Sequence, residues 1–338
     1  MVFRKEIDFE GFKIQIDEAS KDILPDSFNA PLLCLWEITR NCNLNCIHCY
    51  NNSGKKLKNE LTHEQKLDVA RQIVNAKIFR VCLSGGEPIL CKSFWDIAEI
   101  LTKGKVACST ITNGWYVDSE SAKNFSKYFP FVQVSIDGAK QETHDRIRGK
   151  KDSFNRAVNA CNSLIEAGVK VFISCVANSV NSFEVGEIVD LAYNIGADSF
   201  RIDKVRFTGR AAHNLLSLNP SKKQSLYIDK IIKEKQKEYE NRMRVEYFSN
   251  SVDTFQNHVT SMPNYICYIS PSGCCAPDSM LPFSGSSLKE KSLLEAWGKI
   301  KNSNKKPQFK EIISQVKSNT DFLKLSKIPY YYGELHDI

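Results

Sequence analysis

The sequence predicts an α/β protein with a parallel β-sheet at its centre, and three observations support this. Six short apolar runs typical of buried strands alternate with amphipathic segments of helix length. A helix between consecutive strands forms right-handed βαβ units, which produce a parallel sheet. At 338 residues, the chain is long enough for one barrel-sized domain and a small appendage. These patterns alone fit either an open sheet or a partial barrel.

The predicted elements follow the chain in order, beginning with one or two short strands in residues 1–30. The six central strands are predicted near residues 32–39, 79–83, 106–112, 131–136, 169–177 and 199–205. The intervening helices are predicted near residues 62–77, 93–103, 118–128, 153–167 and 182–195. Thr62 and Gln65 form a capping box at the start of the first of these helices.

Residues 221–244 predict one further helix, amphipathic and exposed, whose charges form a solvated face. From about residue 245 the runs become shorter and richer in Pro, Gly and Ser. We therefore divide the chain into N-terminal strands (1–30), a central α/β domain (31–244) and a small C-terminal extension with its tail (245–338).

The composition is that of an ordinary globular protein, with 25% charged residues, 42% hydrophobic residues and a net charge of +7. The sequence has no nucleic-acid-binding signature, no signal peptide and no window apolar enough to span a membrane. We therefore expect no nucleic-acid or membrane partner. Twelve cysteines without an export signal favour metal binding in a reducing cytoplasm over disulfide bonds.

Three of these cysteines, Cys42, Cys46 and Cys49, lie within eight residues just after the first central strand. Thiolates this close can share one soft metal centre. One alternative is a zinc site with His48 as fourth ligand, and another is a chance cluster. A cubane iron–sulfur cluster has four irons and binds four ligands, so three cysteines would leave one iron open to a substrate.

Polar and glycine residues follow three later strands. The Gly85, Gly86, Glu87 and Pro88 loop follows the second strand, and its glycines would let the backbone approach a ligand closely. Further polar residues at strand ends, where ligands are often bound, are Asn113, Ser135 and Asp137. The structural alternative is that Asp137 satisfies nearby backbone amides.

The C-x3-C-x2-C spacing after a strand, with an aromatic ring before the last cysteine, resembles the radical SAM superfamily. The resemblance implies that Cys42, Cys46 and Cys49 hold a [4Fe-4S] cluster whose open iron binds S-adenosylmethionine (SAM). One-electron reduction, by a donor such as flavodoxin or ferredoxin, would then release a 5′-deoxyadenosyl radical that abstracts a substrate hydrogen. It also favours a partial (β/α)6 barrel over an open sheet.

The same resemblance assigns roles to the polar residues. The GGEP loop, Gly85 to Pro88, would contact the SAM amino group, and Ser135 and Asp137 would lie near its ribose and methionine. Arg148, in a stretch similar to the family's H-D-x-x-R, would bind the SAM carboxylate, which a guanidinium fork suits. Further candidate cofactor contacts are His48, Tyr50 and Asn113.

The C-terminal region resembles the hairpin of the SPASM or twitch extension, which in that family holds an auxiliary cluster. Asp278, however, stands where the ligating cysteine is expected, and Cys274 and Cys275 fall on the turn. We therefore predict one cluster rather than two. Two alternatives remain: Cys267, Cys274 and Cys275 bind something in another arrangement, or Cys274 and Cys275 donate a hydrogen atom to a substrate radical.

The resemblance implies a radical SAM enzyme of the SPASM/twitch-like branch. Residues 206–211 also resemble a P-x-GRA segment of its peptide-modifying members. We expect the substrate to be a ribosomally made peptide, modified by crosslinking, thioether formation or epimerisation. A small molecule such as a sugar, nucleoside or cofactor precursor is the alternative, and a non-catalytic iron–sulfur protein is a remote one. No sequence pattern identifies a general base.

Overall fold

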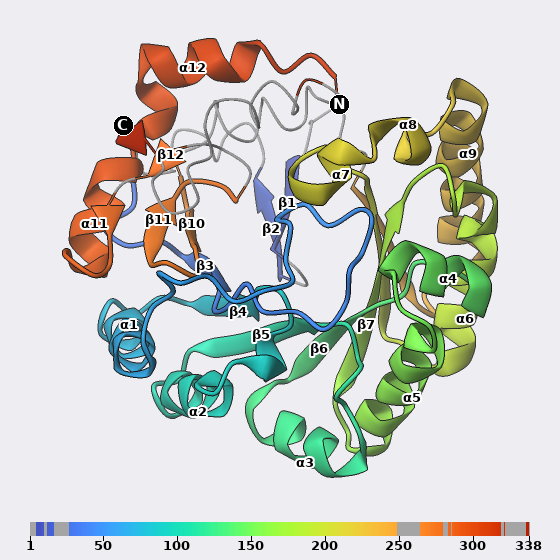
Figure 1. Ribbon diagram of the computed structural model, residues 1–338, viewed down its shortest axis with the longest axis horizontal. Helices are drawn as coiled ribbons and strands as arrows, with labels where there is room; N and C mark the ends of the chain where they lie inside the picture. The colour runs from blue at the N-terminus through green and yellow to red at the C-terminus, as the bar shows by residue number, and fades with distance from the viewer. Residues whose placement is uncertain are drawn as a thin grey trace.

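Seven parallel strands form the centre of the molecule (Figure 1). The computed structural model describes residues 5–9, 12–16, 27–248, 264–279, 283–284, 286–318, 321 and 336–337. The parallel strands are β3 (Leu33–Glu37), β4 (Arg80–Ser84), β5 (Ala107–Thr112), β6 (Phe131–Ser135), β7 (Lys170–Ala177), β8 (Ser199–Lys204) and β9 (Arg244–Phe248). The first six are the strands that the sequence predicts, so the α/β class with a parallel sheet is confirmed.

Three strands from the C-terminal region extend this sheet beyond β3. They are β10 (Ile266–Ile269), β11 (Cys274–Ala276) and β13 (Ser286–Ser287). Strand β10 pairs parallel with β3 and forms an antiparallel hairpin with β11. The full order is β13-β11-β10-β3-β4-β5-β6-β7-β8-β9, so hydrogen bonds among the described residues do not close the sheet into a complete barrel.

Helices cover the outer side of the curved sheet (Figure 1). Those that join the parallel strands are α1 (His63–Asn75), α2 (Phe94–Lys103), α3 (Ser119–Tyr128), α4 (Gln141–Arg148), α5 (Ser153–Glu166), α6 (Val185–Ile195), α7 (Gly209–His213), α8 (Leu215–Leu218) and α9 (Lys222–Glu238). The predicted capping box is present, because the Thr62 hydroxyl accepts from the Gln65 amide while the Gln65 side chain accepts from the Thr62 amide.

The main hydrophobic core lies between the sheet and these helices. Apolar residues alternate along β7 and recur with helical spacing on α2, α3 and α5, so each element buries one face. Phe94 of α2 stacks on Phe129 with 5.5 Å between ring centroids, and Phe125 of α3 packs against both rings. Burying such large aromatic groups is a major source of stability.

Two elements differ from the sequence predictions. The helix predicted over residues 221–244 is shorter in the structure and ends at Glu238. Residues 244–248 instead form β9, in which side chains alternate between two faces. Val245 and Tyr247 pack on the core, whereas Arg244 and Glu246 form an ion pair at 2.8 Å. Helix α4 was not predicted, and it is the element that carries Arg148 into the structure.

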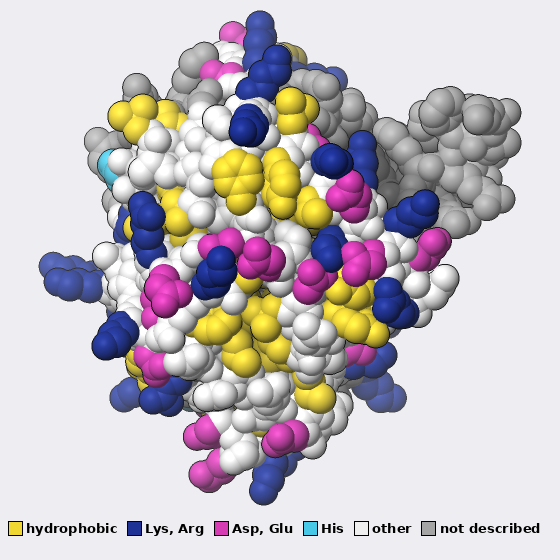
Figure 2. Space-filling view, turned by 90° about the vertical axis from the view of Figure 1, so that its right-hand side faces the viewer, with side chains coloured by type: hydrophobic (Ala, Val, Ile, Leu, Met, Phe, Trp, Pro, Cys, Tyr) yellow, Lys and Arg dark blue, Asp and Glu magenta, His cyan; other side chains and the backbone are white. Residues whose placement is uncertain are grey.

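The outer face of α9 is a solvated surface, as expected. Lys230 pairs with Glu234 at 3.7 Å, and both side chains are exposed. Figure 2 shows basic and acidic side chains interspersed on this side of the molecule, with apolar side chains between them. This face therefore lacks the one-sided positive field typical of a nucleic-acid footprint.

The remaining elements are short helices within the α/β region and elements at the two ends of the chain. An N-terminal hairpin of β1 (Lys5–Phe9) and β2 (Phe12–Ile16) confirms the predicted short strands. Short and C-terminal elements are η2 (Pro88–Leu90), η3 (Ser182–Glu184), β12 (Phe283–Ser284), α11 (Leu293–Ile300), η4 (Ser303–Lys305), α12 (Pro307–Ser314) and β14 (His336–Asp337). Trp297 of α11 is fully buried and donates its ring N–H to the Phe28 carbonyl at 2.9 Å, which fastens α11 to the segment before β3. No helix within the described ranges is long and apolar enough to cross a membrane.

Candidate active site

The cysteine loop, residues 38–61, connects β3 to α1 and runs over the carboxyl ends of the strands. Its base is fastened by the buried carboxylate of Glu60, which accepts hydrogen bonds from the Thr39 hydroxyl (3.1 Å), the Arg40 amide (2.7 Å) and the Leu57 amide (3.1 Å). Carboxylates that accept several hydrogen bonds are strong anchors. The start and the end of the loop are thereby held together.

The two glycines after β4 press against this loop. The Gly86 amide donates to the Thr39 carbonyl at 2.7 Å. Gly85 has φ +147°, and a Cβ on it would lie 2.3 Å from the Thr39 carbonyl oxygen; a Cβ on Gly86 would lie equally close to the Asn41 carbonyl. Only glycine fits such an approach. The sequence predicted that these glycines let the backbone approach a ligand closely. In the structure, the backbone at Gly85 and Gly86 instead closely approaches the backbone of the cysteine loop.

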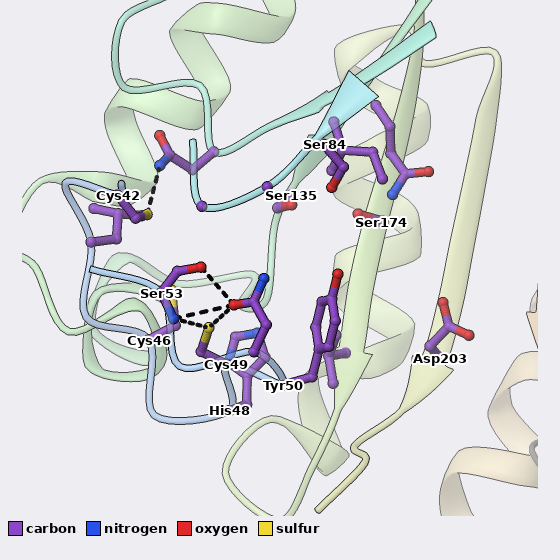
Figure 3. A pocket seen from close by; sticks show the side chains of 18 of the residues that line it. Cys42, Cys46, His48, Cys49, Tyr50, Ser53, Ser84, Ser135, Ser174 and Asp203 are labelled. Atoms are coloured by element: carbon purple, nitrogen blue, oxygen red, sulfur yellow. Dashed lines mark hydrogen bonds between the residues drawn. The ribbon is translucent and has the colours of Figure 1, made fainter. Parts of the chain in front are cut away.

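A pocket of about 320 Å³ opens between the cysteine loop and the strand ends. Figure 3 shows the Cys42, Cys46 and Cys49 side chains on one side of this space and Ser84, Ser135 and Ser174 across from them. Other predicted residues that line the pocket are His48, Tyr50, Gly85, Gly86, Asn113 and Arg148. The structure thus gathers most of the sequence-predicted site into one cavity.

The three thiols each have a polar neighbour. The Cys42 sulfur accepts from the Asn113 side-chain amide at 3.9 Å, and the Cys46 sulfur accepts from Arg148 at 3.9 Å. The Cys49 thiol donates to the Asn51 side chain at 3.0 Å. Burial raises the pKa of Cys42 to about 12, so binding of a metal must displace a proton there.

The donor set fits an iron–sulfur cluster. Three thiols from one loop face a common cavity, and soft thiolate ligands are those that such clusters use. Within the described residues, no three His, Cys, Asp or Glu side chains converge on a single metal ion. His48 instead lies 3.4 Å from the Asp137 carboxylate, and burial lowers its pKa to about 4.

Arg148 and Asp137 form a buried ion pair behind the thiols. The guanidinium lies 2.7 Å from the Asp137 carboxylate, which also accepts from the Val176 amide at 2.8 Å. Burial opposes ionisation of Asp137, but Arg148, helped by His48 and His144, holds its pKa below the ordinary value. Asp137 is fully buried and is not among the pocket-lining residues. Its contact with the Val176 amide is of the kind expected if Asp137 satisfies nearby backbone amides. Arg148 does line the pocket, and its buried Nε has no hydrogen-bond partner, which suits an anionic ligand group.

Glu87 and Pro88 also lie outside the pocket lining. The fully buried Glu87 carboxylate accepts from the Thr112 hydroxyl and from the Asn113 amide, both at 2.8 Å. Asn113 in turn donates to the Asn43 side chain at 2.9 Å. Glu87 therefore links the end of β5 to the cysteine loop.

The pKa of Glu87 gives a testable pH dependence. Burial raises this pKa from 4.5 to about 7, against the hydrogen bonds from Asn113 and Thr112. The protonated form is favoured in the folded state, so its stabilising contribution is complete below pH 4.5 and is lost as the pH rises through about 7. Glu87→Gln keeps a neutral acceptor, and the unfolding free energy of the variant relative to wild type should rise by roughly 3 kcal/mol across this range.

Urea unfolding of the iron-free protein at several pH values measures this difference. Glu64→Gln, at an exposed position of α1, is the matched control and should track the wild type. A constant difference between Glu87→Gln and wild type across the range would contradict the prediction.

Sequence reasoning missed two features of the site. Glu37 is fully buried at the end of β3 and accepts a 2.5 Å hydrogen bond from the Tyr50 hydroxyl. The sequence signal that could have identified Glu37 is a single carboxylate at the end of an otherwise apolar strand. Arg210, known only as part of a resembling segment, lines the pocket and donates to two carbonyls of the cysteine loop.

The second cysteine group lies apart from the pocket. Cys267 and Cys275 meet Cys34 of β3 in the core, where hydrogen bonds from Cys275 and Cys34 hold the pKa of Cys267 below its ordinary value. Cys274 is buried on the hairpin beside Ser272, whose hydroxyl donates to its sulfur at 3.7 Å. None of the three hairpin cysteines is among the residues that line the pocket.

Comparisons with known proteins define the class of this site. Residues 36–192 match the model of the radical SAM superfamily. The chain carries a radical SAM domain, and this superfamily uses a [4Fe-4S] cluster together with SAM.

Individual relatives extend the comparison. The chain is 36% identical over 198 residues to mycofactocin maturase MftC of Mycolicibacterium smegmatis, covering 58% of this chain and 50% of that protein. It is 28% identical over 249 residues to sporulation killing factor maturation protein SkfB of Bacillus subtilis, covering 73% of this chain and 60% of that protein. The chain therefore spans about half to three-fifths of the length of these relatives.

The structure of SuiB from Streptococcus suis bound to its precursor peptide SuiA superimposes with a TM-score of 0.67 at 15% identity. The match covers 91% of this chain and 73% of SuiB. At this identity the likeness shows the fold, which is the TIM-like barrel of radical SAM enzymes with a sheet left open here.

Proposed function

We propose that this protein is a radical SAM enzyme that modifies a ribosomally made peptide. The observation that carries the proposal is the placement of three thiols from one loop around a cavity that a buried arginine also lines. Support for the peptide comes from the names of the similar proteins, two of which are maturation enzymes and one of which was solved with its precursor peptide.

In this proposal Cys42, Cys46 and Cys49 hold the cluster. Bound together and reduced by one electron, the cluster and SAM supply a carbon-centred radical that removes a hydrogen atom from the substrate. The buried Nε of Arg148 is positioned to bind the SAM carboxylate, and Asn113 and Ser135 offer polar groups from neighbouring strand ends. Asp137 holds the arginine in place through the 2.7 Å ion pair.

The opposite wall of the pocket is the proposed substrate side. It carries Ser174 from β7 and Arg201 and Asp203 from β8, the last two paired at 3.1 Å. Apolar groups such as Leu44, Ile111 and Val176 complete the lining and exclude water from the reacting atoms. A flavodoxin- or ferredoxin-like protein is the proposed electron donor, and the cytoplasm, where free thiols stay reduced, is the proposed compartment.

The function is tested with anaerobically reconstituted protein, SAM, a one-electron reductant and a short peptide encoded next to this chain. We expect 5′-deoxyadenosine to form and the peptide mass to fall by the hydrogens lost in a crosslink, or, for an epimerisation, a residue to change configuration at constant mass. Formation of 5′-deoxyadenosine with an unchanged peptide would favour a small-molecule substrate. SAM binding without any 5′-deoxyadenosine would favour the non-catalytic iron–sulfur protein.

A further inference from the structure

Residues 208–214, which follow β8 and include the short helix α7, contact the cysteine loop from the far end of the sheet. The Thr208 hydroxyl donates to the Tyr50 carbonyl at 2.9 Å. The Arg210 amide donates to the Cys49 carbonyl at 2.8 Å, and the Asn214 side chain donates to the Ile47 carbonyl at 3.0 Å. We call these residues the clamp segment. It satisfies carbonyl oxygens that the irregular loop cannot pair internally.

The Arg210 side chain adds two further bonds. One guanidinium nitrogen donates to the Cys46 carbonyl at 2.9 Å and the other to the Ser53 carbonyl at 2.5 Å. A single fork therefore bridges the two sides of the loop that contains Cys46 and Cys49. Within the part of the chain that the structure describes, no carboxylate lies within ion-pair distance of this guanidinium, so its charge is directed at the loop.

The close approach of the clamp segment depends on Gly209. Its φ is +54°, and a Cβ there would lie 2.3 Å from the Tyr50 carbonyl oxygen. A side chain at this position would push the segment away from the loop. The whole segment lies beyond residue 192, where the match to the superfamily model ends.

We propose that Arg210 is a positioning residue that fixes the backbone of Cys46 and Cys49 and raises the reduction potential of the cluster that they bind. The inference rests on the proposed function only in placing a cluster on these cysteines. One-electron reduction adds a negative charge to the cluster. A nearby half-buried cation stabilises the reduced form more than the oxidised form. Hydrogen bonds around the ligands and nearby charge both tune such potentials.

The test compares reconstituted Arg210→Gln and Arg210→Lys with the wild type. The measurements are iron content and the midpoint potential from a redox titration followed by electron paramagnetic resonance. In Arg210→Gln the equilibrium constant for cluster reduction should fall about tenfold, which corresponds to a potential lower by about 59 mV for one electron. Arg210→Lys keeps the charge and should stay close to the wild type.

Two controls separate charge from loop geometry. Asn214→Ala removes a clamp hydrogen bond without changing charge and should shift the potential less than Arg210→Gln. Lys204→Gln removes a cation that also lines the pocket but pairs with Asp229 at 3.2 Å, and it should shift the potential less than Arg210→Gln.

Several outcomes would overturn the inference. These are a wild-type potential in Arg210→Gln, an equal shift in Asn214→Ala, or a shift in Arg210→Lys as large as in Arg210→Gln. If Arg210→Gln binds no iron, Arg210→Lys decides: a wild-type potential supports the inference, and loss of iron there too overturns it. Absence of a cluster from the wild type would instead contradict the proposed function, so the two failures are distinguishable.

Discussion

Replacing Cys42, Cys46 and Cys49 together with alanine should reduce bound iron from about four atoms per chain to none after anaerobic reconstitution. The three thiols line one pocket, and the superfamily of the matched domain uses one [4Fe-4S] cluster at such a site. With these ligands removed, no thiol remains among the residues that line the pocket except Cys175 of β7. Iron and sulfide assays with the visible absorption spectrum measure the loss.

A second set of three thiols provides the matched control. Cys34, Cys267 and Cys275 are buried together in the core, and replacing them with alanine should leave about four irons bound. If the wild type binds about eight irons and this control variant only four, a second cluster exists and the prediction of a single cluster is wrong.

Replacing Asp137 with alanine should lower the free energy of unfolding by about 3–5 kcal/mol. The carboxylate is fully buried, and its removal leaves the Arg148 guanidinium without its 2.7 Å partner and the Val176 amide without an acceptor. An uncompensated buried charge accounts for most of this cost. Urea unfolding of the iron-free protein measures it.

The double variant Asp137→Leu with Arg148→Met separates stability from binding. Replacing both charges with apolar groups of similar size should recover most of the lost stability. SAM binding by the double variant, measured by equilibrium dialysis, should nevertheless be weaker than that of the wild type, because the Arg148 guanidinium is absent. A cost below about 1 kcal/mol for Asp137→Ala, the range of a surface ion pair, would show that the pair is not desolvated as the structure indicates.

The strand and helix pattern could be predicted because each βα unit carries its own periodicity. The six predicted strands are confirmed within a few residues, since each contains a short run of apolar residues that the structure buries. Strand β9 was missed because the predicted helix was extended to residue 244 and the residues from about 245 were assigned to the C-terminal extension. Helix α4 was missed because its charged sequence was interpreted only as a motif.

The site residues that could be predicted are those whose pattern is local in the sequence, and those that could not depend on contacts between distant segments. The spacing of the three cysteines is local, so the thiol group was readable from the sequence. The structure places Asp137 and Glu87 outside the residues that line the pocket. The direction of each buried side chain depends on contacts with strands distant in the sequence, so the sequence alone could not predict this placement. The contacts of Arg210 were beyond sequence reasoning for the same reason, since its partner Cys46 is 164 positions away.

The clamp segment also determines when the site can form during folding. Its side-chain bonds to the cysteine loop join residues 157 to 167 positions apart, with nearly the whole parallel sheet between them. Closing so long a loop costs conformational entropy that is recovered only after the intervening strands have paired. The contacts between the clamp segment and the cysteine loop are therefore expected to form only after the intervening strands have paired.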